Sequence, residues 1–366
     1  MNYNALLKIE QPTRLAWLKQ TLSLPEIELS QLPAKVSQRL WVSPAEFLVV
    51  TSAPVLAQWA LQVSGSWRPA LPEATKRRGP KPVYQDWSVM LVALVQVAWQ
   101  MEYAEVIDYF RGHPQTAEVA GFAAGRVISI GQYWERRRAI GVLPFWFLFI
   151  AFVAQLIWLG VITGTDVILD ATTLQGWFRT DLEAKWSFPK PWKGSVWGYK
   201  VHTLLCRWSQ LPIMFLVTPA NRQDSPFAIT LLTLAAVCLE LPITLVRADA
   251  GYFTLPIMCF IRTVLKASFV IDYNLRRQGK RFLATLFFVD QWRFHLRPRA
   301  IIERHFAWAK RYFGLQQAHW CGLIAAYQQT ALVYSTMLAV ALIAHRYQRP
   351  ELAGSRTHVL AHKTLA

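Results

Sequence analysis

The chain has 366 residues, of which 39 are Lys or Arg and 22 are Asp or Glu, so its formal net charge is +17. A protein this basic favours a polyanionic partner, because each neutralised phosphate releases condensed counterions. Four widely spaced cysteines exclude the paired short spacing of zinc sites, and we expect buried, reduced thiols. The opening residues lack the pattern of a secretory signal, so the expected location is cytoplasmic.

The apolar content is high for so basic a chain, at 54% with a mean hydropathy of +0.22. One run, Val142 to Ile162, has no charged residue and reaches the roughly 20 residues that cross a bilayer. It contains Pro144 and Gln155, so we predict a buried core helix and keep a single membrane span as the alternative. A second run, Thr330 to Ile343, is only about three to four turns long. We therefore expect no membrane partner.

The first part of the chain divides at a basic segment. Residues 1–70 have mixed character, and residues 71–84, LPEATKRRGPKPVY, combine proline, glycine and basic side chains that break any regular period. We predict an exposed linker there. Residues 85–163 then show helical periodicity, with helices at Asp86 to Met101 and at Tyr103 to Phe110.

A basic helix closes this region. Ser129 has the character of an N-cap, the following turns carry Arg136 and Arg137, and Gly141 ends the helix. Several short helices that end in a polar, basic one resemble a helix-turn-helix, whose last helix enters the major groove. We predict that Arg136 and Arg137 contact DNA, although basic residues at a helix end also suit the helix dipole.

From Asp166 the pattern changes to strands alternating with helices. The predicted order is strand, hairpin, helix, strand, helix, strand and helix: Asp166–Asp170, Gly198–Arg207 with Leu211–Thr218, Ser225–Leu239, Ile243–Asp249, Thr254–Leu265, Ala267–Asp272 and Arg299–Phe313. This α/β order matches a ribonuclease-H-like domain with a mixed five-stranded sheet and flanking helices. We assign it residues 164–318, with residues 319–366 as a C-terminal helix and tail.

Two acidic residues close apolar strands of this domain. Asp170 and Asp249 each occupy a strand end, where a carboxylate is costly to desolvate unless a cation compensates. In the predicted topology these ends lie side by side and the last helix, with Glu303, packs across them. Three carboxylates suit two divalent ions about 3.5 to 4 Å apart. We predict Mg²⁺, with Mn²⁺ as a substitute. Asp166 competes with Asp170 for the first position.

Three blocks carry a family resemblance: ILDATTL (168–174), RADAGYF (247–253) and RAIIERHFAWAKRYFGL (299–315). They resemble the catalytic blocks of bacterial insertion-sequence transposases of the DDE class. In that family Arg stands four positions before the Glu, Lys seven positions after it, and Tyr three positions before the Arg. Arg299, Glu303 and Lys310 keep this spacing, whereas Leu296 stands at the Tyr position. The resemblance covers roughly Thr75 to Ile343 and favours Asp170 over Asp166.

The resemblance also implies DNA contacts. Arg299 and Lys310 fall near the same helix face as Glu303, where they would touch phosphates on either side of the cut. Tyr252, in the second block, and Lys200, in GYKVH, are further candidates. Some relatives carry a Trp between the second and third acids that stacks on a flipped base. Trp292 lies in that interval, and we interpret it as a core residue.

The implied activity is that of a bacterial, nucleoid-associated transposase. It would use two metal ions to cut double-stranded DNA at element inverted repeats and to join the freed 3′ end to target DNA. A homodimer would hold two ends. The alternatives are a nuclease of the same fold that does not join ends, a copy that binds DNA without catalysis, and a single-span membrane protein.

Overall fold

The computed structural model describes residues 14–22, 32–35, 38–66, 84–123, 126–190, 194–272, 294–316 and 321–362. The chain forms two compact units. The sheet unit comprises Met1–Trp17, Leu156–Arg311 and Gln316–Ala326, and the helical unit comprises Leu18–Gln155, Tyr312–Leu315 and Tyr327–Ala366. The segment from Leu18 onward and the C-terminal segment from Tyr327 thus belong to the same unit as the central helices. The predicted linker up to Val83, and Trp292, lie outside the described residues.

The helical unit contains the predicted helices. Its elements are α2 (Pro44–Val50), α3 (Ala53–Ser66), α4 (Asp86–Trp99), α5 (Tyr103–Gly112), α6 (Pro114–Val119), α7 (Ile130–Ile140), most of α8 (Leu143–Trp158) and α14 (Leu323–Arg346), and α15 (Arg356–Val359). Ser129 caps α7 through Gln132 in a capping box, and Gly141 ends the helix with a φ of 78°. Both features confirm the sequence prediction.

Two apolar helices bear on the membrane question. The Val142–Ile162 run is confirmed as a buried helix, α8, of 16 residues. The run from Thr330 was underestimated, because it belongs to α14, which has 24 residues. By length and composition α14 alone could cross a membrane, and three bent helix pairs would also qualify if each counted as one span. In the described part of the chain, 83% of the apolar window of α14 is buried.

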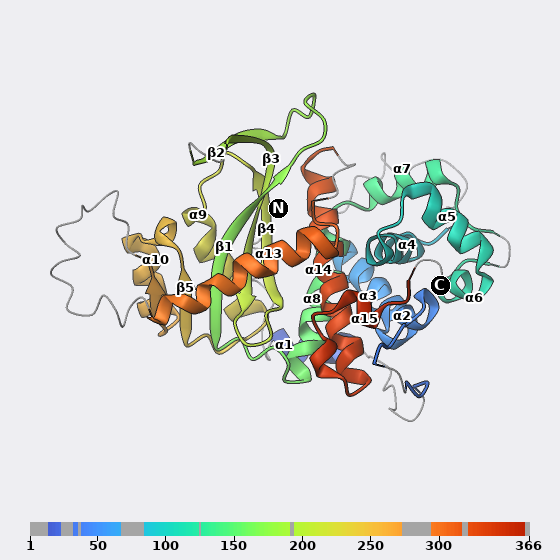
Figure 1. The fold of residues 1–366 in the computed structure, drawn as a ribbon, viewed down its shortest axis with the longest axis horizontal. Helices are drawn as coiled ribbons and strands as arrows, with labels where there is room; N and C mark the ends of the chain where they lie inside the picture. The colour runs from blue at the N-terminus through green and yellow to red at the C-terminus, as the bar shows by residue number, and fades with distance from the viewer. Residues whose placement is uncertain are drawn as a thin grey trace. The chain divides into compact units, whose positions relative to one another are not determined.

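The sheet unit is built on a mixed sheet. Its strands in the described residues are β1 (Asp166–Gln175), β2 (Lys185–Lys190), β3 (Gly194–Cys206), β4 (Pro212–Pro219), β5 (Leu245–Ala248) and β6 (Ser268–Ile271). The order is β2-β3-β1-β5-β6, with β4 also paired to β3 (Figure 1). β1 pairs with β3 antiparallel and with β5 parallel, so the first and fourth predicted strands are neighbours.

The sheet differs from the prediction in two respects. It has six strands in the described residues, because β2 joins the edge through the cross-strand pair Trp186 and Trp197. Pro189 obscured this strand in the sequence, and proline is tolerated at sheet edges. β1 also continues past Asp170 to Gln175, since β3 keeps pairing with it after the parallel partner β5 has ended. Asp170 therefore marks the end of parallel pairing rather than the end of the strand.

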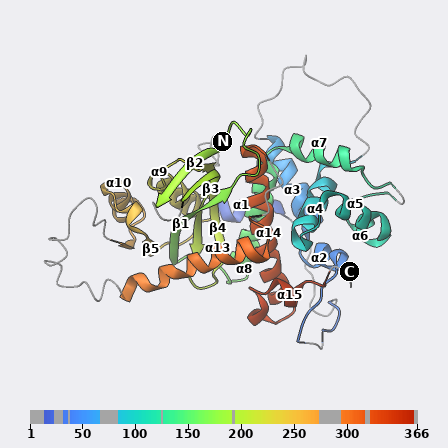
Figure 2. The ribbon, with the colours of Figure 1, turned by 45° about the horizontal axis from the view of Figure 1, so that its top comes forward.

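Helices cover both faces of the sheet. On one face α13 (Ala300–Tyr312) packs Ile302 and Phe306 against Ile168 and Leu205, and both views show it crossing the sheet (Figures 1 and 2). On the other face α9 (Ser225–Thr233) places Phe227 against His202, with ring centroids 4.6 Å apart. A short helix, α10 (Leu255–Cys259), leads to β6. This layered, mixed sheet is a ribonuclease-H-like fold, as predicted.

The cysteines are only partly as expected. Cys206 and Cys238 are buried, but Cys259 and Cys321 are exposed, and none of these four described cysteines forms a disulfide. Ile257 and Ile261 point inward around α10 at helical spacing, which leaves Cys259 on the outer face. Apolar neighbours in the sequence therefore did not predict burial.

Gly198 allows the close approach of β3 to β1. Its φ is +152°, and a Cβ there would collide with the carbonyl oxygen of Leu174 and the backbone nitrogen of Gly176. We expect Gly198→Ala to destabilise the protein by about 2–4 kcal/mol, measured by urea denaturation. Gly131→Ala is the control, since its Cβ meets nothing within 4 Å. Equal losses for the two variants would contradict this explanation.

Candidate active site

Asp170 and Asp249 are brought together by the parallel pairing of β1 and β5. Leu169 is in register with Ala248, so the next residue of each chain segment is an aspartate at the same level. Neighbouring strands lie about 4.8 Å apart. The amide of Ala171 donates to Oδ1 of Asp170 at 2.8 Å, and that of Gly251 donates to Oδ1 of Asp249 at 2.9 Å. The predicted pair of carboxylates thus exists.

The surroundings of both carboxyl groups oppose their ionisation. Burial, and then the charge of Asp249, raise the pKa of Asp170 from 3.8 to about 7. Burial also raises the pKa of Asp249, although the hydrogen bond from Gly251 opposes that change. Repulsion between neighbouring, partly buried carboxylates is relieved by a proton or by a cation. The site is therefore built to accept positive charge.

Arg299 supplies one positive charge. It precedes α13, in the short 3-10 helix Arg297–Arg299, and donates to Oδ2 of Asp170 at 3.1 Å and to Oε1 of Glu303 at 2.8 Å. Glu303 has 61% of its side chain exposed. Lys310, two turns further along α13, donates to the carbonyl oxygen of Thr173 on β1 at 2.8 Å. Arg299 and Lys310 thus contact β1, and Glu303 is tied to the site through Arg299.

Asp166 is engaged elsewhere. It is buried, and its carboxylate accepts two hydrogen bonds of 2.9 Å from Arg247 and one of 2.8 Å from Arg207. Arg247 also donates to the carbonyl oxygen of His295. Asp166 therefore holds β1, β3 and β5 together through ion pairs. This arrangement favours Asp170, rather than Asp166, as the first acid of the site.

The structure adds Asp224 to this region. Asp224 occupies the N-cap position of α9, but its side chain makes no capping hydrogen bond. Instead it forms an ion pair of 2.9 Å with Lys200, and its charge also raises the pKa of Asp170 and of Asp249. Lys200 was a candidate from the sequence, but its ion pair with Asp224 joins segments that are 24 positions apart, and no linear motif shows that contact.

Tyr252 and Lys200 are less open to DNA than predicted. Tyr252 is 1% exposed, and burial and the nearby charges of Asp170, Asp224 and Asp249 raise the pKa of its hydroxyl well above the usual value. Its ring packs inside the domain, because Tyr252 lies at the end of the short 3-10 helix Ala250–Tyr252 that follows β5. Lys200 has 14% of its side chain exposed. The placement of Tyr252 argues against a surface contact.

Arg136 and Arg137 also differ from each other. Arg136 pairs with Asp86 and keeps 22% of its side chain exposed. Arg137 is buried, because it shares the inward stripe of α7 with Tyr133 and Ile140, and it donates to Gln96 at 2.9 Å and to Gln329 at 3.4 Å. We correct its predicted role: Arg137 links α7 to α4 and α14. Arg138 is the exposed neighbour, with its guanidinium 5.7 Å from the Trp134 ring.

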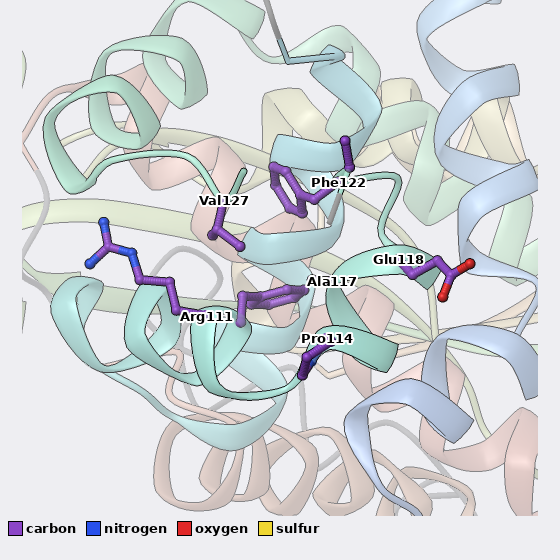
Figure 3. A pocket seen from close by; sticks show the side chains of 8 residues that line it. Arg111, Pro114, Ala117, Glu118, Phe122 and Val127 are labelled. Atoms are coloured by element: carbon purple, nitrogen blue, oxygen red, sulfur yellow. The ribbon is translucent and has the colours of Figure 1, made fainter. Parts of the chain in front are cut away.

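A pocket of about 420 Å³ lies in the helical unit (Figure 3). Apolar side chains from α5, α6 and the following loop line it, including Phe110, Ala117 and Phe122. Arg111 and Glu118 extend to opposite sides of it. None of the predicted site residues lines this pocket, so it is separate from the acidic site.

Residues 163–339 match the family model described as a transposase DDE domain. This segment is a transposase DDE domain. It contains Asp170, Asp249, Glu303 and the basic residues around them. No curated protein matches the chain. Among solved structures, a piggyBac transposase in a synaptic complex with hairpin DNA is similar at a TM-score of 0.42 and 9% identity, over 87% of this chain and 81% of that one.

The raised pKa of Asp170 predicts how stability depends on pH. A carboxyl whose pKa rises from 3.8 to about 7 on folding contributes stability below pH 4 that is lost as the pH rises through 7. We expect Asp170→Asn to stabilise the metal-free protein by about 1–3 kcal/mol above pH 7 and to change little near pH 4. Thermal unfolding of both proteins across this range measures the difference. A gain that does not depend on pH would refute the assignment.

Proposed function

We propose that the protein is a transposase that cuts DNA at the ends of its element and joins the freed 3′ ends to target DNA, with Asp170, Asp249 and Glu303 as the metal ligands. The observation that carries this proposal is the pair of adjacent, partly buried carboxylates with a cationic side chain already bridging Asp170 and Glu303. The bacterial insertion-sequence subgroup is part of the proposal, because Leu296 replaces the signature Tyr.

The residues present fit a divalent ion. Carboxylate oxygens are the ligands that Mg²⁺, and in its place Mn²⁺, prefer. In the described part of the chain, no three His, Cys, Asp or Glu side chains are grouped closely enough to hold an ion. Glu303 is turned toward Arg299, but with 61% of its side chain exposed it can change rotamer at low cost. We infer that Glu303 completes the site when Arg299 releases Asp170.

Each basic residue then has a defined task. Bound divalent ions would activate water and stabilise the leaving 3′ oxygen at the scissile phosphate. Arg299, once released from Asp170, pairs with a phosphate oxygen, for which its planar fork of donors is suited. Lys310 neutralises a neighbouring phosphate from its position over Thr173. The exposed Arg138 and the partly exposed Arg136 are the DNA contacts that we propose in the helical unit.

Two copies of the chain would hold two element ends, and the protein would act in the bacterial cytoplasm, at the nucleoid.

The experiment uses a labelled duplex that carries the terminal inverted repeat beside the coding region, a supercoiled target plasmid, and Mg²⁺ or a chelator. We expect nicking at the repeat and label joined to the plasmid with Mg²⁺ only. Nicking without joining would identify a nuclease. Product formation in the chelator would overturn the metal assignment.

A further inference from the structure

Several large apolar side chains of the sheet unit are exposed in one place. The segment that follows β1 and the edge strand β2 present Trp177, Phe178, Leu182 and Trp186, with exposed fractions of 64%, 43%, 88% and 40%. Together with Arg179 we call these residues the aromatic surface. β2 forms the edge of the sheet opposite β6 (Figures 1 and 2). Contiguous exposed apolar side chains of this kind mark interaction sites.

The aromatic surface is held by the fold. Beneath it, buried Asp181 accepts hydrogen bonds from the Tyr199 hydroxyl at 2.7 Å and from the backbone of Glu183 at 3.1 Å and of Gly322 at 2.8 Å. Trp197, the cross-strand partner of Trp186 at a ring separation of 5.5 Å, donates its indole N–H to the carbonyl oxygen of Phe178. The backbone that carries the exposed rings is therefore held in place by the fold.

Charge indicates the kind of partner. The guanidinium of Arg179 lies 4.6 Å from the centroid of the Trp186 ring, and Lys185 is also exposed. Of the two acids nearby, Asp181 is buried and Glu183 binds the backbone of Leu323. Aromatic rings interleaved with cations are the combination that binds single-stranded nucleic acid, because bases stack on the rings and the cations meet phosphates. In a paired duplex each base is covered on both faces by its neighbours, so it cannot stack on these rings.

The surface also lies on the path that leads from the acidic site. The part of β1 from Asp170 to its end at Gln175 is about 17 Å long, at ~3.3 Å per residue. The aromatic surface begins two residues after Gln175, at Trp177. Lys310 contacts β1 at Thr173, between the two places. At ~3.4 Å per nucleotide along a strand, this length corresponds to about five nucleotides.

We propose that the aromatic surface stacks on unpaired bases of a DNA strand, about five nucleotides from the phosphate at the acidic site. The proposal rests on the proposed function, which brings DNA to Asp170 and Asp249. Trp177 and Phe178 are the stacking residues, and Arg179 pairs with the phosphate of the same strand. The surface thereby distinguishes a DNA end that has been opened from one that is fully paired.

The test compares a blunt duplex with the same duplex carrying a single-stranded overhang that contains 2-aminopurine, in chelator so that no cleavage occurs. We expect the wild type to bind the overhang more tightly and to quench 2-aminopurine. Trp177→Ala and Phe178→Ala should each weaken overhang binding by about five- to a hundredfold, with blunt binding unchanged. Trp208→Ala is the matched control, since Trp208 is 62% exposed beneath Arg207 at the far end of β3. Thermal unfolding verifies that all three variants fold.

Three results would overturn the proposal: no preference of the wild type for the overhang, an equal loss in Trp208→Ala, or a change of oligomeric state in the variants with overhang binding retained. The last result would identify an interface between copies of the chain. Because the binding assay needs no catalysis, normal cleavage by variants of the acidic residues would refute the proposed function without affecting this test.

Discussion

Asp249→Asn is expected to lower the rate of DNA cleavage by at least about a thousandfold, because several kcal/mol of transition-state charge stabilisation depend on the bound cations. Asparagine keeps the shape of the side chain and can still accept the hydrogen bond from Gly251, so the fold should persist. It removes the negative charge that, together with Asp170, attracts a divalent ion. The rate of nicking of the labelled repeat duplex with Mg²⁺ measures the effect.

DNA binding must be measured beside cleavage. In chelator, Asp249→Asn should bind the repeat duplex at least as tightly as the wild type, since one negative charge near the phosphate path is lost. Asp108→Asn is the control, because Asp108 is an exposed carboxylate, paired with Arg111 at 3.1 Å, in the helical unit. Nicking by Asp249→Asn at the rate of Asp108→Asn would remove Asp249 from the site.

Local patterns in the sequence were sufficient to predict much of the sheet unit. The apolar run before Asp249 specified β5, and the spacing of Ile302 and Phe306 specified the inner face of α13. Because parallel neighbours align their ends, the topology alone placed Asp170 beside Asp249. These features depend on short-range periodicity and on a few topological rules, which a single sequence contains.

Other features depend on contacts between distant segments. Nothing near Asp170 shows that β1 continues to Gln175, since the antiparallel partner that extends it is β3. Arg137 has the charge of a DNA contact, yet it is buried because Gln96 and Gln329 satisfy it inside the helical unit. The same holds for Arg299, whose link between Asp170 and Glu303 becomes visible only when α13 is placed on β1.

Asp166→Asn is expected to destabilise the sheet unit by about 3–5 kcal/mol, because it breaks a buried ion pair and leaves one partner charged. Only 4% of the Arg247 side chain is exposed, and three of its hydrogen bonds to Asp166 are lost or weakened. Arg207 loses its partner as well. Urea denaturation followed by circular dichroism measures the change. Asp86→Asn serves as the control, since that partly exposed pair with Arg136 should contribute less than about 1 kcal/mol.

The contrast with Asp170 makes this prediction decisive for the first acid of the site. Both residues belong to β1, but Asp166 is neutralised by two arginines, whereas Asp170 faces another carboxylate. Above pH 7 the asparagine variants should therefore shift stability in opposite directions, down for Asp166 and up for Asp170. Activity should separate them too: Asp166→Asn should recover cleavage at lower temperature, where the variant is folded, and Asp170→Asn should not. Stabilisation by Asp166→Asn, or recovery by Asp170→Asn, would reverse the two assignments.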